Sequence, residues 1–219
     1  AAIPAPFRER MAMAYSTGKR IVGMVEADLK PSDILTQAAF RNAIIVNSAI
    51  GGSTNAPPHL QAVARHAGVP LDVTDWQTYG FDVPMLVNMQ PAGKHLGESF
   101  YRAGGVPAVM AELAVAGRLD LDVQTVSGEP IGRQLKGVRS SDLDVITTHE
   151  TPLREKAGLL VLSGNLFDSA LMKMSVISDD FRQRFLSTPG EEGVFEAKAV
   201  VFEGPEDYHE RINKPELNI

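Results

Sequence analysis

The segment Gly51-Gly52-Ser53-Thr54-Asn55 is the first place in the chain where residue types and spacing indicate chemistry. Two successive glycines let a backbone approach a ligand closely, and the next three residues supply two hydroxyl groups and an amide. A helix is predicted directly after them, and the free N–H groups at a helix start favour anions. The alternative is a plain connection between two helices, because such turns are common. No Gly-Lys-Ser/Thr follows, so this is not a P-loop.

A second candidate is Gly164-Asn165, which follows the apolar run 159–162. Ligands often bind in loops beyond strand ends, so this loop indicates a second contact to a small molecule. The alternative is a Gly-Asn turn between two strands. Lys173, farther along, could either face such a site or reach the surface.

The histidines do not predict a metal centre. His59 and His66 are seven residues apart and share a helix face, whereas helical metal pairs are separated by three or four residues. One buried and one surface histidine is the favoured interpretation. The remaining three are scattered, and chain order alone cannot assign a catalytic triad. The acidic residues near the C-terminus are interpreted as a solvated helix face: Glu203, Glu206, Asp207 and Glu210.

Composition excludes several classes of protein. The chain has 219 residues, with 21 Lys and Arg against 27 Asp and Glu, so the net charge of −6 argues against nucleic-acid binding. No apolar run approaches the roughly 20 residues that span a bilayer, and charges at Arg8, Glu9 and Arg10 do not fit a signal peptide. The 219 residues contain no cysteine, which excludes disulfides and cysteine-held metals within them. We therefore expect a soluble, cytoplasmic protein with no membrane partner.

The elements that must position these residues are helices first and strands later. Helical spacing predicts helices over 7–29, 38–49, 55–66 and 106–116 and a short helix or turn over 75–79. Gly18 is a weak point at which the first could divide in two, and the second is apolar nearly all round, as in a buried helix. Short apolar runs predict strands over 83–89, 123–126, 145–148, 159–162, 171–177 and 194–202, and a last short helix over 206–211.

This order predicts an α/β fold: the helix-rich end of an α/β domain, followed by the opening strands of a β-barrel-like domain. The change from predicted helices to predicted short strands indicates where the domains begin and end. Residues 1–120 are predicted to end the α/β domain, residues 121–155 to link the two parts, and residues 156–219 to begin an incomplete β-rich domain.

Four motifs in a fixed order carry a resemblance to a known family: Gly51–Ala56 with His59-Leu60, Arg102–Pro107, Thr125–Gly128 and Gly164–Leu166. They are similar to segments of the dihydroxy-acid and phosphogluconate dehydratases. The stretches Ala1–Pro6 and Ser163–Lys173 look closest to the sugar-acid branch, the arabinonate and xylonate dehydratases. Family members are more than twice as long, so the resemblance implies that this chain is an internal piece.

The resemblance implies a hydro-lyase that removes water from a sugar acid, a 2,3-dihydroxy acid, and forms a 2-keto-3-deoxy acid. It also implies an iron–sulfur cluster, Mg²⁺ and a dimer or tetramer, with the cysteines, carboxylates and catalytic serine outside this segment. No catalytic or metal-binding residue is expected here. Substrate-lining or supporting roles are expected for the two loops: Ser53, Thr54, Asn55, His59, Gly164 and Asn165.

Two other hypotheses remain open at this point. The chain could be a stand-alone module that binds a small acid or assembles with a partner, without catalysis. It could also be an unrelated enzyme that binds an anion at Gly51–Asn55. A loop that is buried away from any ligand would exclude the second of these.

Overall fold

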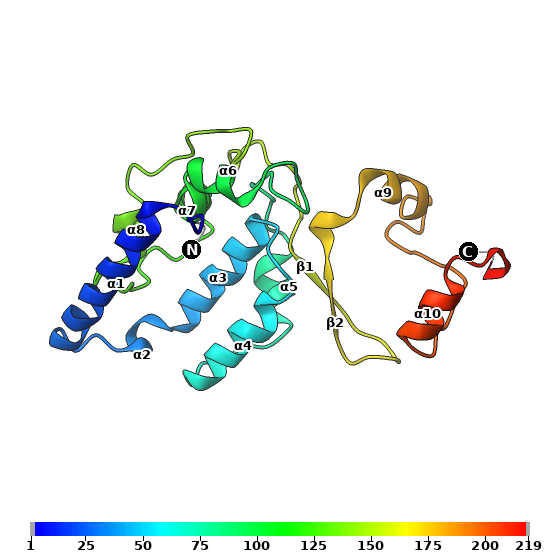
Figure 1. Cartoon of the computed structure of the whole chain (residues 1–219), viewed down its shortest axis with the longest axis horizontal. Coiled ribbons are helices and arrows are strands. Elements are labelled where there is room, and N and C mark those ends of the chain that lie inside the picture. The colour runs from blue at the N-terminus through cyan, green and yellow to red at the C-terminus, as the bar shows by residue number, and fades with distance from the viewer. Residues whose placement is uncertain (1–2, 218–219) are drawn as a thin grey trace. The chain divides into compact units, whose positions relative to one another are not determined.

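A computed structural model describes residues 3–217 and divides the chain into two compact units, Ala1–Val176 and Ile177–Ile219 (Figure 1). Within the described residues, eight helices of the first unit precede its first regular strand. Their bounds are α1 Arg8–Glu26, α2 Pro31–Ile34, α3 Gln37–Ala49, α4 Ala56–His66, α5 Asp75–Gly80, α6 Gly97–Arg102, α7 Gly105–Val115 and α8 Ile131–Gln134. Every helix among the described residues is too short or too polar to cross a lipid bilayer.

The predicted helices are confirmed, with small shifts at their ends. Helix α1 runs through Gly18 without a break, so one glycine does not divide a helix of 19 residues. Helix α3 starts where the hydroxyl of Thr36 accepts the backbone N–H of Ala39 at 3.3 Å, a standard N-cap. It is buried on most of its surface, as its apolar sequence predicts.

Helices α3 and α7 form the centre of the main hydrophobic core. Ile45 and Val46 of α3 pack with Val109 and Leu113 of α7. The extended segment 83–87 completes this core, and its Leu86 N–H donates to the carbonyl of Ala49 at 2.8 Å. The end of α3 is thereby fixed, and with it the start of the glycine-rich loop that follows.

One buried side chain, Asn42, ties α3 to the turn after α7. Its amide Nδ2 donates to the carbonyl of Asp120 at 2.8 Å, and its Oδ1 accepts the N–H of the same residue at 3.0 Å. Asn42 is only 5% exposed. Buried amides are stable only when such partners exist, so this pair fixes where the chain leaves α7.

The first unit ends in a two-stranded antiparallel sheet. Strand β1 (Leu159–Leu162) pairs with β2 (Ala170–Lys173), with Leu159 opposite Lys173 and Leu162 opposite Ala170. A single 3₁₀ turn, η1 (Met174–Val176), follows. The sheet packs on the helices through a second hydrophobic cluster of Ile44, Trp76 and Leu159.

The helix-rich α/β expectation is thus confirmed, whereas several predicted strands are wrong. The segment 83–89 is extended and mostly buried, but it pairs only through single bridges, to residues 154, 146 and 95. The predicted strand 145–148 likewise contributes one bridge, and 123–126 belongs to a turn with a bridge between Gln124 and Pro130. These segments lie beside helices and loops. A regular strand would need another strand as its neighbour.

Residues 171–177 form a shorter strand than predicted, because β2 ends at Lys173 and η1 follows. Residues 194–202 form no strand, although apolar and polar side chains alternate there. Val194, Phe195 and Val201 are half or more exposed. Alternation stabilises a strand only when a partner buries the apolar face, and the structure offers none within the described residues.

The second unit contains α9 (Asp179–Phe185), α10 (Pro205–Arg211) and the 3₁₀ turn η2 (Pro215–Leu217). Its small apolar cluster is aromatic: the rings of Phe181, Phe185 and Phe195 lie 4.9–5.7 Å apart. Of the acidic residues predicted to form a solvated helix face, Glu206 and Glu210 are exposed on α10, Glu203 is exposed before the helix begins, and Asp207 is half-buried. One of them, Asp207, binds Arg211 at 2.8 Å, and the backbone N–H of Glu203 lowers the pKa of the Asp207 carboxyl.

We expect Asn42→Ala to lower the free energy of unfolding by about 1–3 kcal/mol, because it leaves the two backbone groups of Asp120 unpaired. Asn42→Asp keeps the size and one acceptor but sets a carboxylate against a carbonyl, so it should cost at least as much. Chemical denaturation followed by circular dichroism measures both. Asn55→Ala is the matched control, since the Asn55 side chain makes no capping hydrogen bond; an equal loss for the control would contradict the prediction.

A second prediction concerns Gly158. A Cβ added there would lie 2.0 Å from the carbonyl oxygen of Gly80, a backbone atom that cannot rotate away. Gly158→Ala should therefore separate β1 from α5 and destabilise the first unit by about 1–3 kcal/mol or more. Gly97→Ala is the control, because a Cβ there meets nothing within 4 Å. A melting temperature unchanged in Gly158→Ala would show that the contact can relax.

Candidate functional site

The glycine-rich loop lies between α3 and α4 and is tightly folded onto the end of α3. Gly51 has a φ of +59°, a conformation that favours glycine. The N–H of Gly52 donates to the carbonyl of Asn47 at 2.8 Å, and a Cβ on Gly52 would lie 2.0 Å from Asn47 Oδ1. Gly51 is therefore favoured by its backbone conformation. Gly52 is favoured by the close approach of Asn47, whose carbonyl oxygen would also lie 2.9 Å from an added Cβ.

Helix α4 begins at Ala56, one residue after the predicted start, and Asn55 occupies the N-cap position without a side-chain capping hydrogen bond. The expectation that this helix start supplies free N–H groups is wrong for two positions, because Pro57 and Pro58 lie in the first turn and have no N–H. The hydroxyl of Ser53 accepts the N–H of Asn55 at 3.1 Å. A ligand at this loop would thus meet side-chain groups more than backbone donors, and those of Thr54 and Asn55 are exposed.

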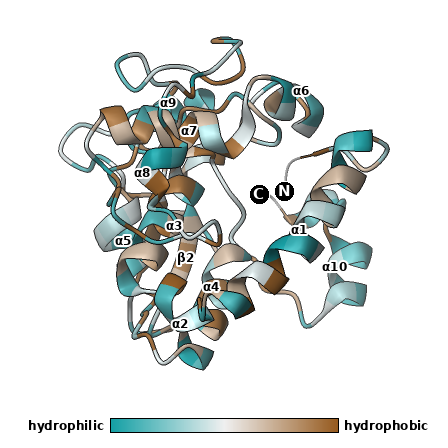
Figure 2. Ribbon diagram, turned by 90° about the vertical axis from the view of Figure 1, so that its left-hand side faces the viewer, coloured by the Kyte–Doolittle hydropathy of each residue, from teal (hydrophilic) through white to brown (hydrophobic). Residues whose placement is uncertain are grey.

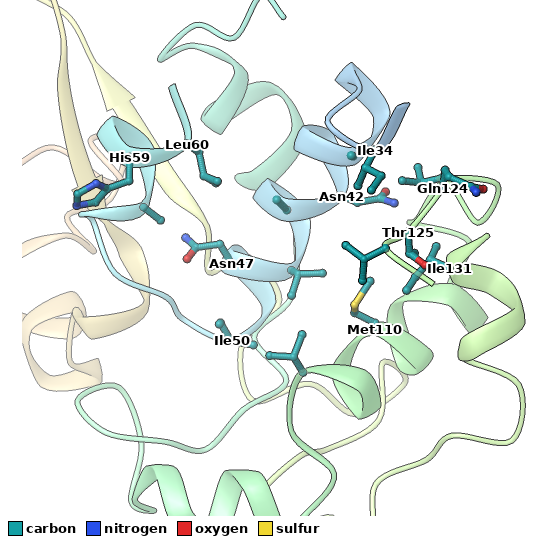
Figure 3. Close-up of a pocket in the computed structure, with 17 residues that line it drawn as sticks. Ile34, Asn42, Asn47, Ile50, His59, Leu60, Met110, Gln124, Thr125 and Ile131 are labelled. Carbon is teal, nitrogen blue, oxygen red and sulfur yellow. The ribbon is translucent and has the colours of Figure 1, made fainter. Parts of the chain in front are cut away.

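A pocket of about 640 Å³ lies beside this loop (Figure 3). It opens between α3, α4, α7 and the segment 123–131. Figure 3 shows Met110 and Ile131 at one side and His59 at the opposite edge, with its ring pointing away from them. Its lining is mostly apolar: Ile34, Ala39, Asn42, Ala43, Val46, Asn47, Ile50, Ala56, His59, Leu60, Val106, Met110, Val123, Gln124, Thr125, Val126 and Ile131.

A hydrogen-bonded cluster closes the far side of this pocket. Thr125 Oγ1 and Ser127 Oγ are 2.8 Å apart, and the Gln134 amide donates to Ser127 Oγ at 2.8 Å. Arg20 of α1 donates from Nε to the carbonyl of Val126. Thr125, Val126 and Ser127 belong to the Thr125–Gly128 motif, which the sequence identifies only as part of the family resemblance. In the structure the two hydroxyl groups of this motif bond to one another and to Gln134.

The glycine-rich loop also meets the end of β2. Gly51 and Gly52 lie with Lys173 and Ser175 around a junction that is too small for a water molecule. Ser175 is 1% exposed, and its Oγ has no hydrogen-bond partner among the described residues. Partial burial lowers the pKa of the Lys173 ammonium. The sequence could not place these two residues beside the loop, because more than 120 residues separate them.

Gly164 and Asn165 lie in the exposed loop between β1 and β2, where the N–H of Gly164 donates to the carbonyl of Phe167 at 3.0 Å. Lys173 lies at the other end of the four-residue ladder. At about 3.4 Å per residue, the loop therefore starts about 10 Å from the junction with Gly51. The described residues do not bring Gly164 and Asn165 into one pocket with Ser53, Thr54, Asn55 and His59.

Two histidines outside the predicted site bind carboxylates that are distant in sequence. Nε2 of His95 lies 2.9 Å from Asp144 Oδ2, and Nδ1 of His149 lies 3.3 Å from Glu112 Oε2. Each pair joins a loop to another part of the first unit. These two pairs hold the fold together and account for the polar surroundings of His95 and His149.

The side chains of the described residues do not form a binding site for a metal ion or an iron–sulfur cluster. Among residues 3–217, no three His, Cys, Asp or Glu side chains come together as a metal-binding group. The sequence also contains no cysteine. The polar groups present suit hydrogen bonding to a small polar molecule at the loops.

Two family models match the chain. Residues 1–134 match the dihydroxy-acid/6-phosphogluconate dehydratase N-terminal model, and residues 144–219 match the C-terminal model. The resemblance seen in the four motifs is therefore confirmed, and the matches continue from one family region into the other.

Curated relatives match over the same extent. The chain is 59% identical to D-xylonate dehydratase of Caulobacter vibrioides and 45% identical to L-arabinonate dehydratase of Rhizobium leguminosarum, over all of its own length. It is 40% identical to a dihydroxy-acid dehydratase of Caldicellulosiruptor bescii over 92% of its length. It spans only 36–37% of these relatives. The chain belongs to the dihydroxy-acid/6-phosphogluconate dehydratase family and covers the junction between that family's N-terminal and C-terminal regions.

Proposed function

We propose that the longer protein containing this chain dehydrates a sugar acid to a 2-keto-3-deoxy acid. The observation that supports it is that the two highest identities reported, 59% and 45%, are to xylonate and arabinonate dehydratases, whereas a further L-arabonate dehydratase at 40% is level with the dihydroxy-acid dehydratases at 40% and 37%. Substrate preference within a family depends on a few pocket groups, so relatives that share more of this segment are the better guide.

The two exposed loops are the parts of this segment proposed to bind and orient the substrate. The hydroxyl of Thr54 and the amide of Asn55 can each hydrogen-bond a carboxylate or hydroxyl of an aldonate. Asn55 supports this role because its side chain is not used as a helix cap. His59 lies one turn farther along α4. Ser53 holds the loop in shape through the N–H of Asn55.

Gly164 and Asn165 are proposed to contact the substrate or a neighbouring group from the second loop. Because the loops do not share a pocket here, other parts of the longer protein would complete the site. We assign no catalytic role to any residue in this segment: its contribution is to bind and orient.

An iron–sulfur cluster and Mg²⁺ are proposed for the longer protein, where they would act as Lewis acids on the leaving hydroxyl and the developing negative charge. Their ligands would come from outside residues 3–217, which contain no fitting group. We further propose a cytoplasmic homo-oligomer, and the domain limits 1–120, 121–155 and 156–219 remain predictions.

The substrate proposal is tested on the longer protein, purified without oxygen and with Mg²⁺. We expect D-xylonate or L-arabinonate to be converted with a kcat/KM at least about tenfold above that of a branched 2,3-dihydroxy acid, because polar contacts to sugar hydroxyls discriminate strongly. Formation of the 2-oxo product is followed with a carbonyl reagent. Preference for the branched acid would assign the protein to the other branch, and no turnover of either would contradict the proposal.

The loop assignment predicts that Asn55→Ala raises KM for the sugar acid about tenfold, since one hydrogen bond to a charged group is worth about 1.5–3 kcal/mol. The melting temperature should not change. Asn213→Ala, at an exposed position of the second unit, is the matched control and should leave both quantities unchanged. Wild-type kinetics in Asn55→Ala would remove this loop from the substrate site.

A further inference from the structure

Helix α1 has large apolar residues exposed from Met11 to Val25. Figure 2 shows that apolar and polar residues are interleaved along this helix. Its only buried side chain is Met24. Met11, Tyr15 and Val25 are 75%, 71% and 76% exposed. The helix is held to the first unit elsewhere, by Arg20 on the carbonyl of Val126 and by the edge-on contact of the Phe7 and Tyr101 rings at 5.8 Å.

Most of the exposed large apolar residues share one face of the helix, whereas Met13, 57% exposed, lies on the other side. At about 100° per residue, the spacing of three, four and seven residues places the following on a single stripe: Met11, Ala14, Tyr15, Gly18, Ile21, Val22 and Val25. Met24 and Arg20, which contact the body of the unit, lie on the other side. This is the heptad-like seam by which two helices pack together.

The stripe is symmetric about Gly18. Met11 and Val25 lie seven residues before and after it, Ala14 and Val22 four, and Tyr15 and Ile21 three. An antiparallel copy of the helix would therefore set each of these residues level with an apolar partner. Gly18 has no side chain, and a Cβ there would meet nothing within 4 Å, so two backbones can approach closely at the midpoint.

Charges at the edge of the stripe favour the same arrangement. Arg8 and Glu26 are 18 residues apart, which is five helical turns, so they lie on the same edge at opposite ends. In an antiparallel pair Arg8 of each helix comes next to Glu26 of the other. A parallel pair would instead set Arg8 beside Arg10 of its partner. Both Arg8 and Glu26 are exposed, and neither has an ion pair within the described residues.

We propose that α1 is a self-association surface, through which two copies of this chain pair antiparallel about Gly18. The contact is isologous, as in most symmetric dimers. Burial of the apolar stripe supplies the free energy of association, since exposed ion pairs add little affinity. The flanking charges favour the antiparallel over the parallel arrangement of the two helices. This proposal does not depend on the proposed dehydratase activity.

The absence of cysteine from the sequence makes a direct test possible with the 219-residue chain. Gly18→Cys places a single thiol at the symmetry axis, and mild oxidation should give a covalent dimer as the main product. Ser16→Cys, exposed on another face of α1, is the matched control and should stay monomeric on a denaturing gel.

The direction of pairing has its own test. Met11→Cys and Val25→Cys are about 21 Å apart along the helix, far beyond the reach of a disulfide. Each variant alone should cross-link poorly, whereas an equimolar mixture should form a heterodimer between them. Efficient cross-linking of Met11→Cys alone would indicate a parallel pair and overturn the proposed register.

Sedimentation provides a measurement that does not rely on disulfides. The wild-type chain should show a concentration-dependent dimer, and Val22→Asp should be monomeric. Val115→Asp, at a residue 75% exposed at the end of α7, should dimerise like wild type. Circular dichroism checks that both variants are folded. A monomeric wild-type chain with no Gly18→Cys cross-link would refute the proposal and assign the stripe to another segment of the longer protein.

Discussion

The architecture of the first unit depends on the need to cover α3. Seven of its thirteen residues are buried, so neighbours must pack against it on several sides. Helix α7 and the segment 83–87 meet one side through Ile45 and Val46, and α5 and β1 meet another through Ile44. Burial on this scale also makes polar groups costly unless they are paired. Asn42 binds the backbone of Asp120, and the hydroxyl of Ser48 donates to the carbonyl of Ile44 at 3.0 Å.

The position of the first functional loop follows from that burial. Because α3 is held along its length, its last turn is fixed, and the loop Gly51–Asn55 emerges at a defined place. The glycines then fold the chain back onto Asn47. Thr54 and Asn55 reach solvent from a rigid base, which is the arrangement that binding loops on stable scaffolds commonly have. The loop at Gly164-Asn165 differs, because it lies at the free end of a two-stranded hairpin.

The helices could be predicted because their signals are local. Period, caps and prolines act within a few residues, and the helix predicted over 55–66 is observed as Ala56–His66. Strands depend on partners elsewhere in the chain, and residues 194–202 show that alternation without a partner forms no strand. The same limit applies to the site. The sequence identifies polar loops, but the contact of Gly51 with Ser175, across more than 120 residues, arises only from packing.

The second hydrophobic cluster bears on how the two family regions work together. Ile44 and Trp76 belong to the region matched by the N-terminal model, and Leu159 belongs to the region matched by the C-terminal model. All three are 2% exposed or less. The close approach of Gly158 to the backbone of Gly80 allows this contact. The first strand of the C-terminal region is therefore anchored in the helical core, so the relative placement of loops from the two regions is set by apolar packing close to both.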